Sequence, residues 1–245
     1  QLIMLTEPIT NLYSQNCVIC LKVGDLYSAD YVNNLYHAVR KQCDWNFICF
    51  TDDPVGIDLG VICHGVKPRE CTGWWPTWHK VEIFGRKEIK QYEKKVFFDL
   101  DIVIQGDITP ILESDDDWSF IRCDWKGVKF RMKSPEQSFY TSCCMVWKDL
   151  TWVYDLWESD WENIVKSNVG TDMWYHRQRL PHTTLPKVFY SYREGFKPSH
   201  YWENNCQPHF QYYPDYSVCL FHQKPDIHEL DKDNPLYKIW NATVS

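Results

Sequence analysis

The chain has 245 residues, enough to bury a substantial core, and a formal net charge of −7, which argues against a nucleic-acid backbone as its main partner. No segment is apolar for long enough to suggest a membrane span, and no signal-peptide pattern is found. The 11 cysteines lack zinc-site spacing and mostly fall inside apolar runs, which predicts buried, reduced thiols in the cytoplasm. With no linker or internal repeat, we expect a single domain over residues 1–245.

The first part of the chain predicts alternating strands and helices. Residues 17–21 form a short apolar run typical of a strand, and a turn-rich loop follows. Ser28 can then cap a helix whose apolar residues recur at helical spacing to about Gln42. Residues 47–50 and 60–63 predict two further strands. This order is typical of an open α/β sheet, mixed but mostly parallel and flanked by helices, in which ligands bind beyond the carboxyl ends of the strands.

The pattern continues beyond this point. Pro76 and Gly85 bound a predicted helix over residues 77–84. A Trp-rich amphipathic helix is predicted over residues 150–165, and Thr171 can cap a short helix after it. The remaining apolar runs predict strands over residues 96–104, 119–123, 142–147 and 217–221.

Two aspartates are set into the apolar run of residues 96–104. In an extended chain, Asp99 and Asp101 would project to the same side while Leu100 points into the core. Burying a carboxylate without a partner is costly, and two converging oxygen ligands suit Mg²⁺ or Mn²⁺, which usually carry substrate phosphates. The alternative is a half-buried strand whose carboxylates cap neighbouring backbone amides. Two other D-x-D sequences in the chain lack apolar flanks, so only this one predicts a metal site.

Several short motifs follow one another in a fixed order. They are residues 20–27, 73–75, 97–101, 140–145, 170–172 and 219–225. This ordered set resembles the GT-A glycosyltransferases, specifically the family 8-like group with its bacterial and phage members, over about residues 18–228. The resemblance implies a GT-A fold and a metal-dependent enzyme. Such an enzyme would transfer a sugar from a nucleotide sugar, a UDP-sugar, to a saccharide or other hydroxyl acceptor with retention of configuration.

The resemblance also implies which residues would hold the metal and carry the chemistry. Asp99, Asp101 and His222 would bind Mn²⁺ or Mg²⁺, with His228 as the alternative to His222. Lys80, on the helix over residues 77–84, would contact the donor sugar and phosphate. Asp172 would lie near the anomeric carbon. For His222 and Lys80 the competing interpretations are a structural histidine at the end of a strand and a solvated surface lysine.

The remaining implied residues would bind the donor. Tyr27 would stack on the uracil ring, unless it is an ordinary surface aromatic, and Lys224 would hold a phosphate oxygen. The other implied donor-binding residues are Val23, Asp99, Leu100 and Ser142.

Two interpretations from other functional classes stay open. A sugar-phosphate nucleotidyltransferase would need a glycine-rich, basic phosphate loop after the first strand, and residues 22–25 fit this poorly. A carbohydrate or nucleotide-sugar binding protein without turnover is favoured by residues 170–174, which depart from the family motif. Donor hydrolysis with and without Mn²⁺ separates the binding protein from the enzyme.

Overall fold

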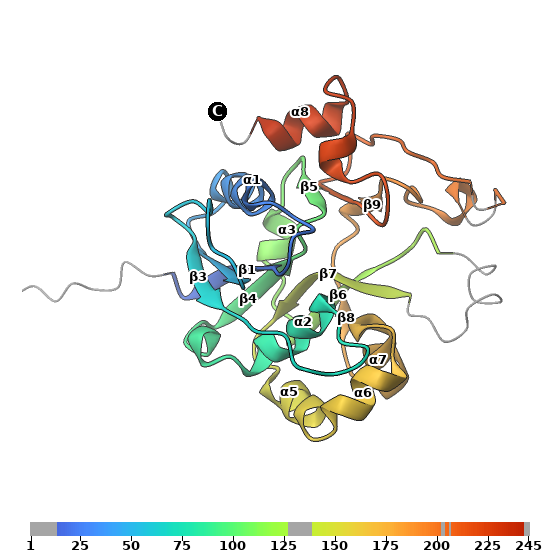
Figure 1. Cartoon of the computed structure of the whole chain (residues 1–245). Coiled ribbons are helices and arrows are strands. Elements are labelled where there is room, and N and C mark those ends of the chain that lie inside the picture. Colours follow the sequence, from blue (N-terminus) through green and yellow to red (C-terminus); the bar gives the residue numbers. More distant parts are fainter. Residues whose placement is uncertain (1–13, 127–138, 202–203, 206, 243–245) are drawn as a thin grey trace, which may run out of the picture.

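The predicted alternation of strands and helices is present in the computed structural model, which describes residues 14–126, 139–201, 204–205 and 207–242 (Figure 1). The main sheet has seven strands in the order β3-β2-β1-β4-β7-β6-β8. They are β1 (Asn16–Lys22), β2 (Asn46–Thr51), β3 (Ile62–Gly65), β4 (Lys94–Phe98), β6 (Trp118–Arg122), β7 (Tyr140–Trp147) and β8 (Thr183–Thr184). Strands β1 to β4 run parallel, whereas β7 is antiparallel to both β4 and β6.

A second, small sheet lies beside the main one. Its strands are β5 (Ile102–Ile104), β9 (Phe189–Ser191) and β10 (Val218–Leu220). β10 occupies the middle, antiparallel to β5 and parallel to β9. The prediction of one strand over residues 96–104 is therefore wrong. β4 ends at Phe98, and the chain leaves the main sheet at Asp99 to enter the small sheet at Ile102.

Helices cover both faces of the main sheet (Figure 1). One face carries α1 (Ala29–Arg40), α3 (Thr109–Leu112), the small sheet and α8 (Pro235–Asn241). The other carries α2 (His79–Glu82), α5 (Thr151–Glu158), α6 (Trp161–Ser167) and α7 (Thr171–Gln178). Short 3₁₀ turns complete the chain: η1 (Pro76–Trp78), η2 (Ile83–Gly85), η3 (Lys87–Ile89), η4 (Pro198–His200) and η5 (Ile227–Glu229). No helix in these described parts is long and apolar enough to cross a membrane.

The side-chain alternation of the strands builds a separate core on each face. In β1, Val18 and Cys20 pack with α1 and the small sheet, whereas Cys17 and Ile19 pack on the α2 side. This two-sided burial explains why the central strands read as continuous apolar runs rather than alternating ones. Every cysteine of the described part is free, in agreement with the prediction of reduced thiols.

Three helix predictions differ from the structure in detail. The helix predicted over residues 77–84 is the succession η1-α2-η2, with α2 as its only α-helical turn. The helix predicted over residues 150–165 is interrupted at Ser159 and Asp160. The hydroxyl of Ser159 donates to the carbonyl of Leu156, and the carboxylate of Asp160 accepts from the side-chain amide of Asn163. Local side-chain bonds of this kind compete with the hydrogen bonds of a regular helix. Ser28 does occupy the N-cap of α1, but its hydroxyl donates to the carboxylate of Asp30 and accepts no bond from a backbone amide of the helix.

Candidate functional site

The two aspartates of the D-x-D sequence lie where the chain crosses between the sheets. The amide of Asp99 donates to the carbonyl of Cys143 in β7, at 2.8 Å. The carbonyl of Asp101 accepts from the amide of Phe221, directly after β10, at 2.9 Å. The crossover is therefore fixed to the main sheet on one side and to the end of the small sheet on the other. The pairing of β5 with β10 brings His222, far away in the sequence, next to this crossover.

Lys80 supplies a buried positive charge to the crossover. Its Nζ lies 2.7 Å from Oδ2 of Asp99 and 3.3 Å from Oγ of Ser142. Only 10% of the side chain is exposed, so Lys80 is not the solvated surface lysine of the competing interpretation. Burial by itself lowers the pKa of Lys80, but the charges of Asp99, Cys143 and Asp172, together with the hydrogen bond to Asp99, outweigh it and the pKa is raised. Lys80 therefore stays cationic over the physiological range.

Asp101, the second carboxylate, forms no ion pair with any residue that the structure describes. Burial, followed by repulsion from Asp99, raises the pKa of Asp101 to about 7, although Lys80 acts in the opposite direction. Among the described residues, Asp99 and Asp101 thus have one cation, Lys80, for two negative charges. This imbalance is what a divalent ion would correct, and oxygen ligands are the kind that Mg²⁺ and Mn²⁺ prefer. The D-x-D crossover therefore fits a divalent cation.

His222 has the properties of a ligand that lacks a partner. Its Nε2 is buried and has no hydrogen-bond partner among the residues the structure describes. Burial, followed by the charge of Lys126, lowers the pKa of His222 to about 4, so the imidazole is neutral at physiological pH. Neutral imidazole is the form that binds metals, and it is compatible with Mn²⁺.

The potential ligand atoms of the three predicted metal ligands do not all lie close to one another. Within the described chain, only one group of three His, Cys, Asp or Glu residues has its potential ligand atoms all within 4.8 Å of one another. The group consists of Asp226, His228 and Glu229. Asp99, Asp101 and His222 are therefore not that close together, and the ligand role of His222 stays a prediction. His228, its alternative, is bonded through Nδ1 to the hydroxyl of Tyr31 at 2.6 Å.

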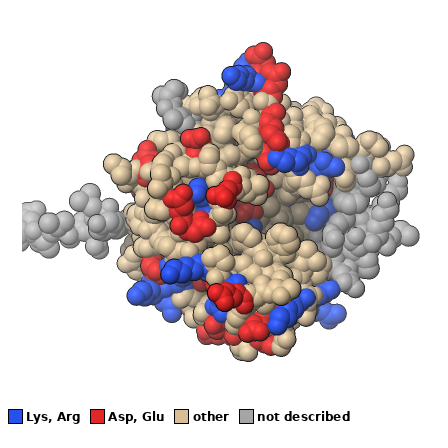
Figure 2. All heavy atoms as spheres, in the orientation of Figure 1, with Lys and Arg blue, Asp and Glu red and all other residues tan. Residues whose placement is uncertain are grey.

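A cavity of about 440 Å³ joins Lys80 to the predicted residues on β7 and α7. Its lining includes Thr77, Lys80, Lys126, Tyr140, Thr141, Ser142, Asp172 and His222. Asp172 lies in the first turn of α7, and its Oδ1 accepts from the amide of Ser142 at 3.0 Å. The face shown in Figure 2 is hollowed near its centre, with acidic side chains gathered beside the hollow. Lys80, Ser142, Asp172 and His222 are thus brought together as the resemblance implied.

The other implied donor-binding residues surround this region less directly. Tyr27 is half-buried against Tyr31, with ring centroids 4.8 Å apart. Burial and the charges of Asp101 and Asp99 raise the pKa of Tyr27, which places the first loop within electrostatic reach of the crossover. Val23 is half-buried against the core on the α2 face.

Leu100 and Lys224 are held by interactions of their own. Leu100 is only 3% exposed and packs in the core, so any ligand contact there would involve its backbone. Lys224 is exposed, and its Nζ lies 2.5 Å from Asp226 and 2.7 Å from Glu229. A phosphate bound to Lys224 would therefore have to compete with these two carboxylates.

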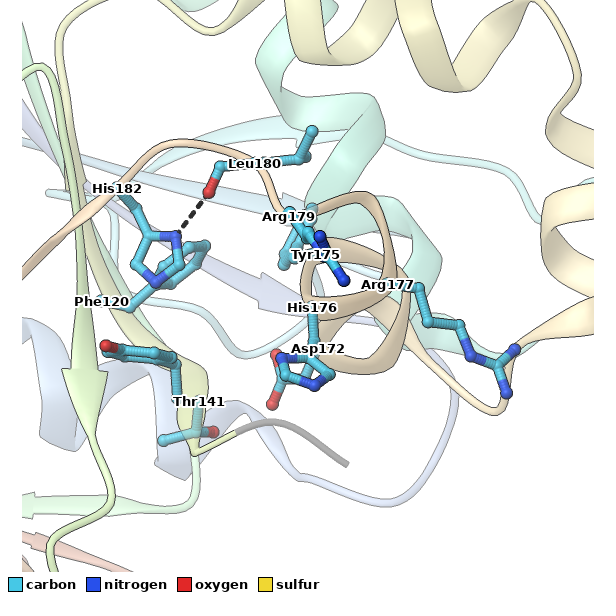
Figure 3. Close-up of a pocket in the computed structure, with 10 residues that line it drawn as sticks. Phe120, Thr141, Asp172, Tyr175, His176, Arg177, Arg179, Leu180 and His182 are labelled. Carbon is cyan, nitrogen blue, oxygen red and sulfur yellow. Dashed lines mark hydrogen bonds between the residues drawn. The ribbon is translucent and has the colours of Figure 1, made fainter. Parts of the chain in front are cut away.

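Several residues of the cavity were not among the predicted site residues, although two of them belong to the motif over residues 140–145. Tyr140 and Thr141 begin β7 and also line a second cavity of about 600 Å³, which Asp172 lines as well (Figure 3). Because β7 is antiparallel to β4, its first residues lie at the carboxyl edge of the parallel strands. Lys126 reaches the same edge after β6. The sequence shows that polar residues stand beside an apolar run. It does not show the direction of the strand, which decides the edge of the sheet at which these residues lie.

Comparison with known proteins identifies the fold. No family model matches the sequence, and no curated protein is significantly similar to it. Among solved structures, the galactosyltransferase LgtC, in complex with donor and acceptor sugar analogues, matches with a TM-score of 0.59. The match has 10% identity and covers 93% of this chain and 94% of LgtC. The chain has a GT-A glycosyltransferase fold.

Two other solved structures share this GT-A fold. The apo form of the glycosyltransferase GlyE from Streptococcus pneumoniae TIGR4 matches with a TM-score of 0.60 and 12% identity, over 93% of this chain and 59% of GlyE. The apo bifunctional glycosyltransferase WbbM matches with a TM-score of 0.54 and 10% identity, over 98% of this chain and 50% of WbbM. The fold predicted from the ordered motifs is thus confirmed, at identities too low to transfer an activity.

The role of His222 can be tested against that of His228. We expect His222→Asn to weaken Mn²⁺ binding by about tenfold, the usual scale for loss of a metal-site contact. His228→Asn should leave Mn²⁺ affinity unchanged and act on stability, because its imidazole bonds to Tyr31. Calorimetric Mn²⁺ titration of both variants at pH 7.5 measures the difference. The reverse order of effects would transfer the ligand role to His228.

Proposed function

We propose that the chain is a metal-dependent, retaining glycosyltransferase that transfers a sugar from a UDP-sugar to a hydroxyl acceptor. The main support is the pair of carboxylates, Asp99 and Asp101, beside one buried cation, Lys80, which lines a cavity. The GT-A fold, shared with a galactosyltransferase crystallised with donor and acceptor sugar analogues, supports the same reaction class.

In the proposed reaction the donor diphosphate leaves as negative charge builds on it. A Mn²⁺ or Mg²⁺ ion held by Asp99 and Asp101 would neutralise that charge when bound. Lys80 keeps its own charge beside Asp99 and adds a fixed positive potential at the donor phosphates. Tyr27 would stack on the uracil ring, and Lys224 would hold a phosphate oxygen after releasing its present partners.

Asp172 would act on the sugar rather than on the phosphates. The amide of Ser142 fixes its carboxylate at the wall of the cavity. There it would stabilise the positive charge that develops at the anomeric carbon. The bond from this carbon to the phosphate oxygen breaks, the bond to the acceptor oxygen forms on the same face, and the acceptor proton passes to the departing phosphate.

Metal and nucleotide should bind together if this proposal is correct. We expect UDP affinity to rise at least tenfold in the presence of Mn²⁺, and Asp101→Ala to abolish the increase, because the ion offsets both the carboxylates and the diphosphate. Calorimetry gives the affinities, and release of UDP from UDP-glucose and UDP-galactose, with and without Mn²⁺, gives the turnover. The matched control is Asp115→Ala, in an exposed D-x-D sequence. Equal UDP affinity with and without Mn²⁺ would contradict the proposal.

The structure argues against a sugar-phosphate nucleotidyltransferase but leaves a nucleotide-sugar binding protein as an alternative. In the first loop, the amide of Gly24 is bonded to the carboxylate of Asp52 at 3.0 Å, so it does not offer a nucleotidyltransferase phosphate an open donor. A nucleotide-sugar binding protein remains the second candidate, because Asp99 is already paired with Lys80. Such a protein would show Mn²⁺-dependent UDP binding without release of UDP from either donor.

A further inference from the structure

The second cavity shares part of its lining with the first. Tyr140, Thr141 and Asp172 line both cavities, so the two spaces meet at the residue that we place beside the reacting carbon. The second cavity has a volume of about 600 Å³, large enough for a saccharide unit. Figure 3 shows its lining, which comes from β6, the start of β7, α7 and the segment after α7.

One wall of the second cavity is aromatic and carries a hydrogen-bond acceptor. The ring of His182 lies edge-on to Tyr140 and Phe120, with centroids 4.4 and 5.0 Å apart. Flat rings of this kind pack against the apolar faces of sugars. His182 Nδ1 lies 2.7 Å from the carbonyl oxygen of Leu180 (Figure 3). A carbonyl only accepts, so Nδ1 carries the proton, and in the neutral ring Nε2 can accept from a sugar hydroxyl.

The charges that line the second cavity are mainly basic. Asp172 is its only carboxylate among the described lining residues, and it is held by the Ser142 amide. Arg177 donates from Nη1 to the Ser167 carbonyl and to Oδ1 of Asn168, and its guanidinium extends away from the other lining side chains (Figure 3). Arg179 is exposed and forms no ion pair with any residue that the structure describes. Among the described residues, Arg179 is therefore a cation that a ligand in this cavity can reach.

The backbone at Arg179 is not one that arginine favours. Arg179 ends α7 in the left-handed region, at φ 50°, a position where glycine is the residue of least cost. Arg179 lines the cavity, and its side chain is exposed. Non-glycine residues in this conformation tend to gather at ligand sites.

We propose that the second cavity binds the acceptor and that this acceptor is a saccharide carrying an anionic group, a carboxylate or a phosphate, which pairs with Arg179. The inference rests on the proposed function, since it names the substrate class of the same site. The aromatic wall takes the apolar face of the sugar, and His182 Nε2 accepts from one of its hydroxyls. The planar guanidinium can hold two oxygens of the anionic group at once.

Binding of simple sugars tests this without any need for turnover. The probes are glucuronate for the carboxylate, glucose 6-phosphate for the phosphate, and glucose as the neutral control, each titrated by ligand-observed NMR at pH 7.5. We expect at least one anionic sugar to bind about tenfold more tightly than glucose, on the scale of a charge-assisted hydrogen bond. Arg179→Gly should remove this preference, and it should do so in a folded protein because glycine suits the backbone at this position.

Matched variants separate the inference from its alternatives. Arg177→Gln, two residues away, should keep the preference for the anionic sugar, and Arg179→Lys should keep part of it. Equal affinity for all three sugars, no measurable binding of either anionic sugar, or a preference that survives in Arg179→Gly would overturn the inference. Release of UDP from UDP-glucose in the absence of sugar reports on the donor reaction separately. Failure of the proposed function would appear there and not in the binding of glucuronate or glucose 6-phosphate.

Discussion

Replacement of Lys80 by methionine is expected to abolish release of UDP from the donor and to lower the free energy of unfolding by about 3 kcal/mol. Methionine fills a similar volume without the charge, so Asp99 and Asp101 are left half-buried without a cation. Removal of one partner from a buried ion pair costs more than the pair contributes, because the other charge stays desolvated. Urea denaturation at pH 7.5 in the presence of EDTA measures the loss.

A double variant distinguishes charge from packing in this result. Lys80→Met combined with Asp99→Asn removes both members of the 2.7 Å pair and should recover most of the lost stability, but not the turnover. Lys87→Met, at an exposed lysine nearby in the chain, is the control and should change neither property. Wild-type stability and turnover in Lys80→Met would mean that the lysine is not part of the site.

Asp101→Asn is expected to stabilise the metal-free protein at pH 8, by on the order of 2 kcal/mol, while it removes metal-dependent turnover. The pKa of Asp101 is raised to about 7 in the folded chain, from an ordinary value of 3.8. Between these values the folded state holds a proton that the unfolded state has lost. The stability that depends on Asp101 is therefore complete below about pH 4 and is lost as the pH rises to about 7. Asparagine is neutral throughout and avoids this loss.

The pH dependence provides the sharper measurement. Urea denaturation of the wild type in EDTA should show stability falling between pH 5 and pH 8, and Asp101→Asn should show a smaller fall. Mn²⁺ should stabilise the wild type more at pH 8 than at pH 5, because the proton and the ion compete for the carboxylate. Asp44→Asn, at an exposed aspartate, should retain the wild-type slope. An equally steep fall in Asp101→Asn would assign the slope to another group.

The order of strands and helices could be predicted from the sequence, because apolar runs and helical periodicity are local properties. The strands predicted over residues 17–21, 47–50 and 119–123 lie within one residue of β1, β2 and β6 at each end. The partners of these strands are not local. The run over residues 96–104 looks continuous, and only the distant pairing of Ile102–Ile104 with Val218–Leu220 shows that its second half belongs to another sheet.

The candidate site could be predicted as a set of residues but not as a geometry. Motif order placed Lys80, Asp172 and His222 in one site, and the structure brings them to one cavity. The sequence could not distinguish a buried lysine from a solvated one, because that depends on Asp99 and Ser142 lying opposite it. It also gave no signal for Arg179, since an arginine at the end of a short polar helix has no distinctive pattern.

The crossover between the two sheets also determines when the site can form during folding. The carbonyl of Asp101 is bonded to the amide of Phe221, and β5 pairs with β10, across almost half of the chain. Closing a loop of this length is slow, because the entropy of closure is lost before the contact is gained. As the chain leaves the ribosome, β1, β2 and β4 can associate early. Asp99 and Asp101 reach their final positions only after β10 has been synthesised and has paired with β5. A nascent or C-terminally truncated chain that ends before Val218 would have most of its main sheet but no completed site, with the edge of β5 open to other chains.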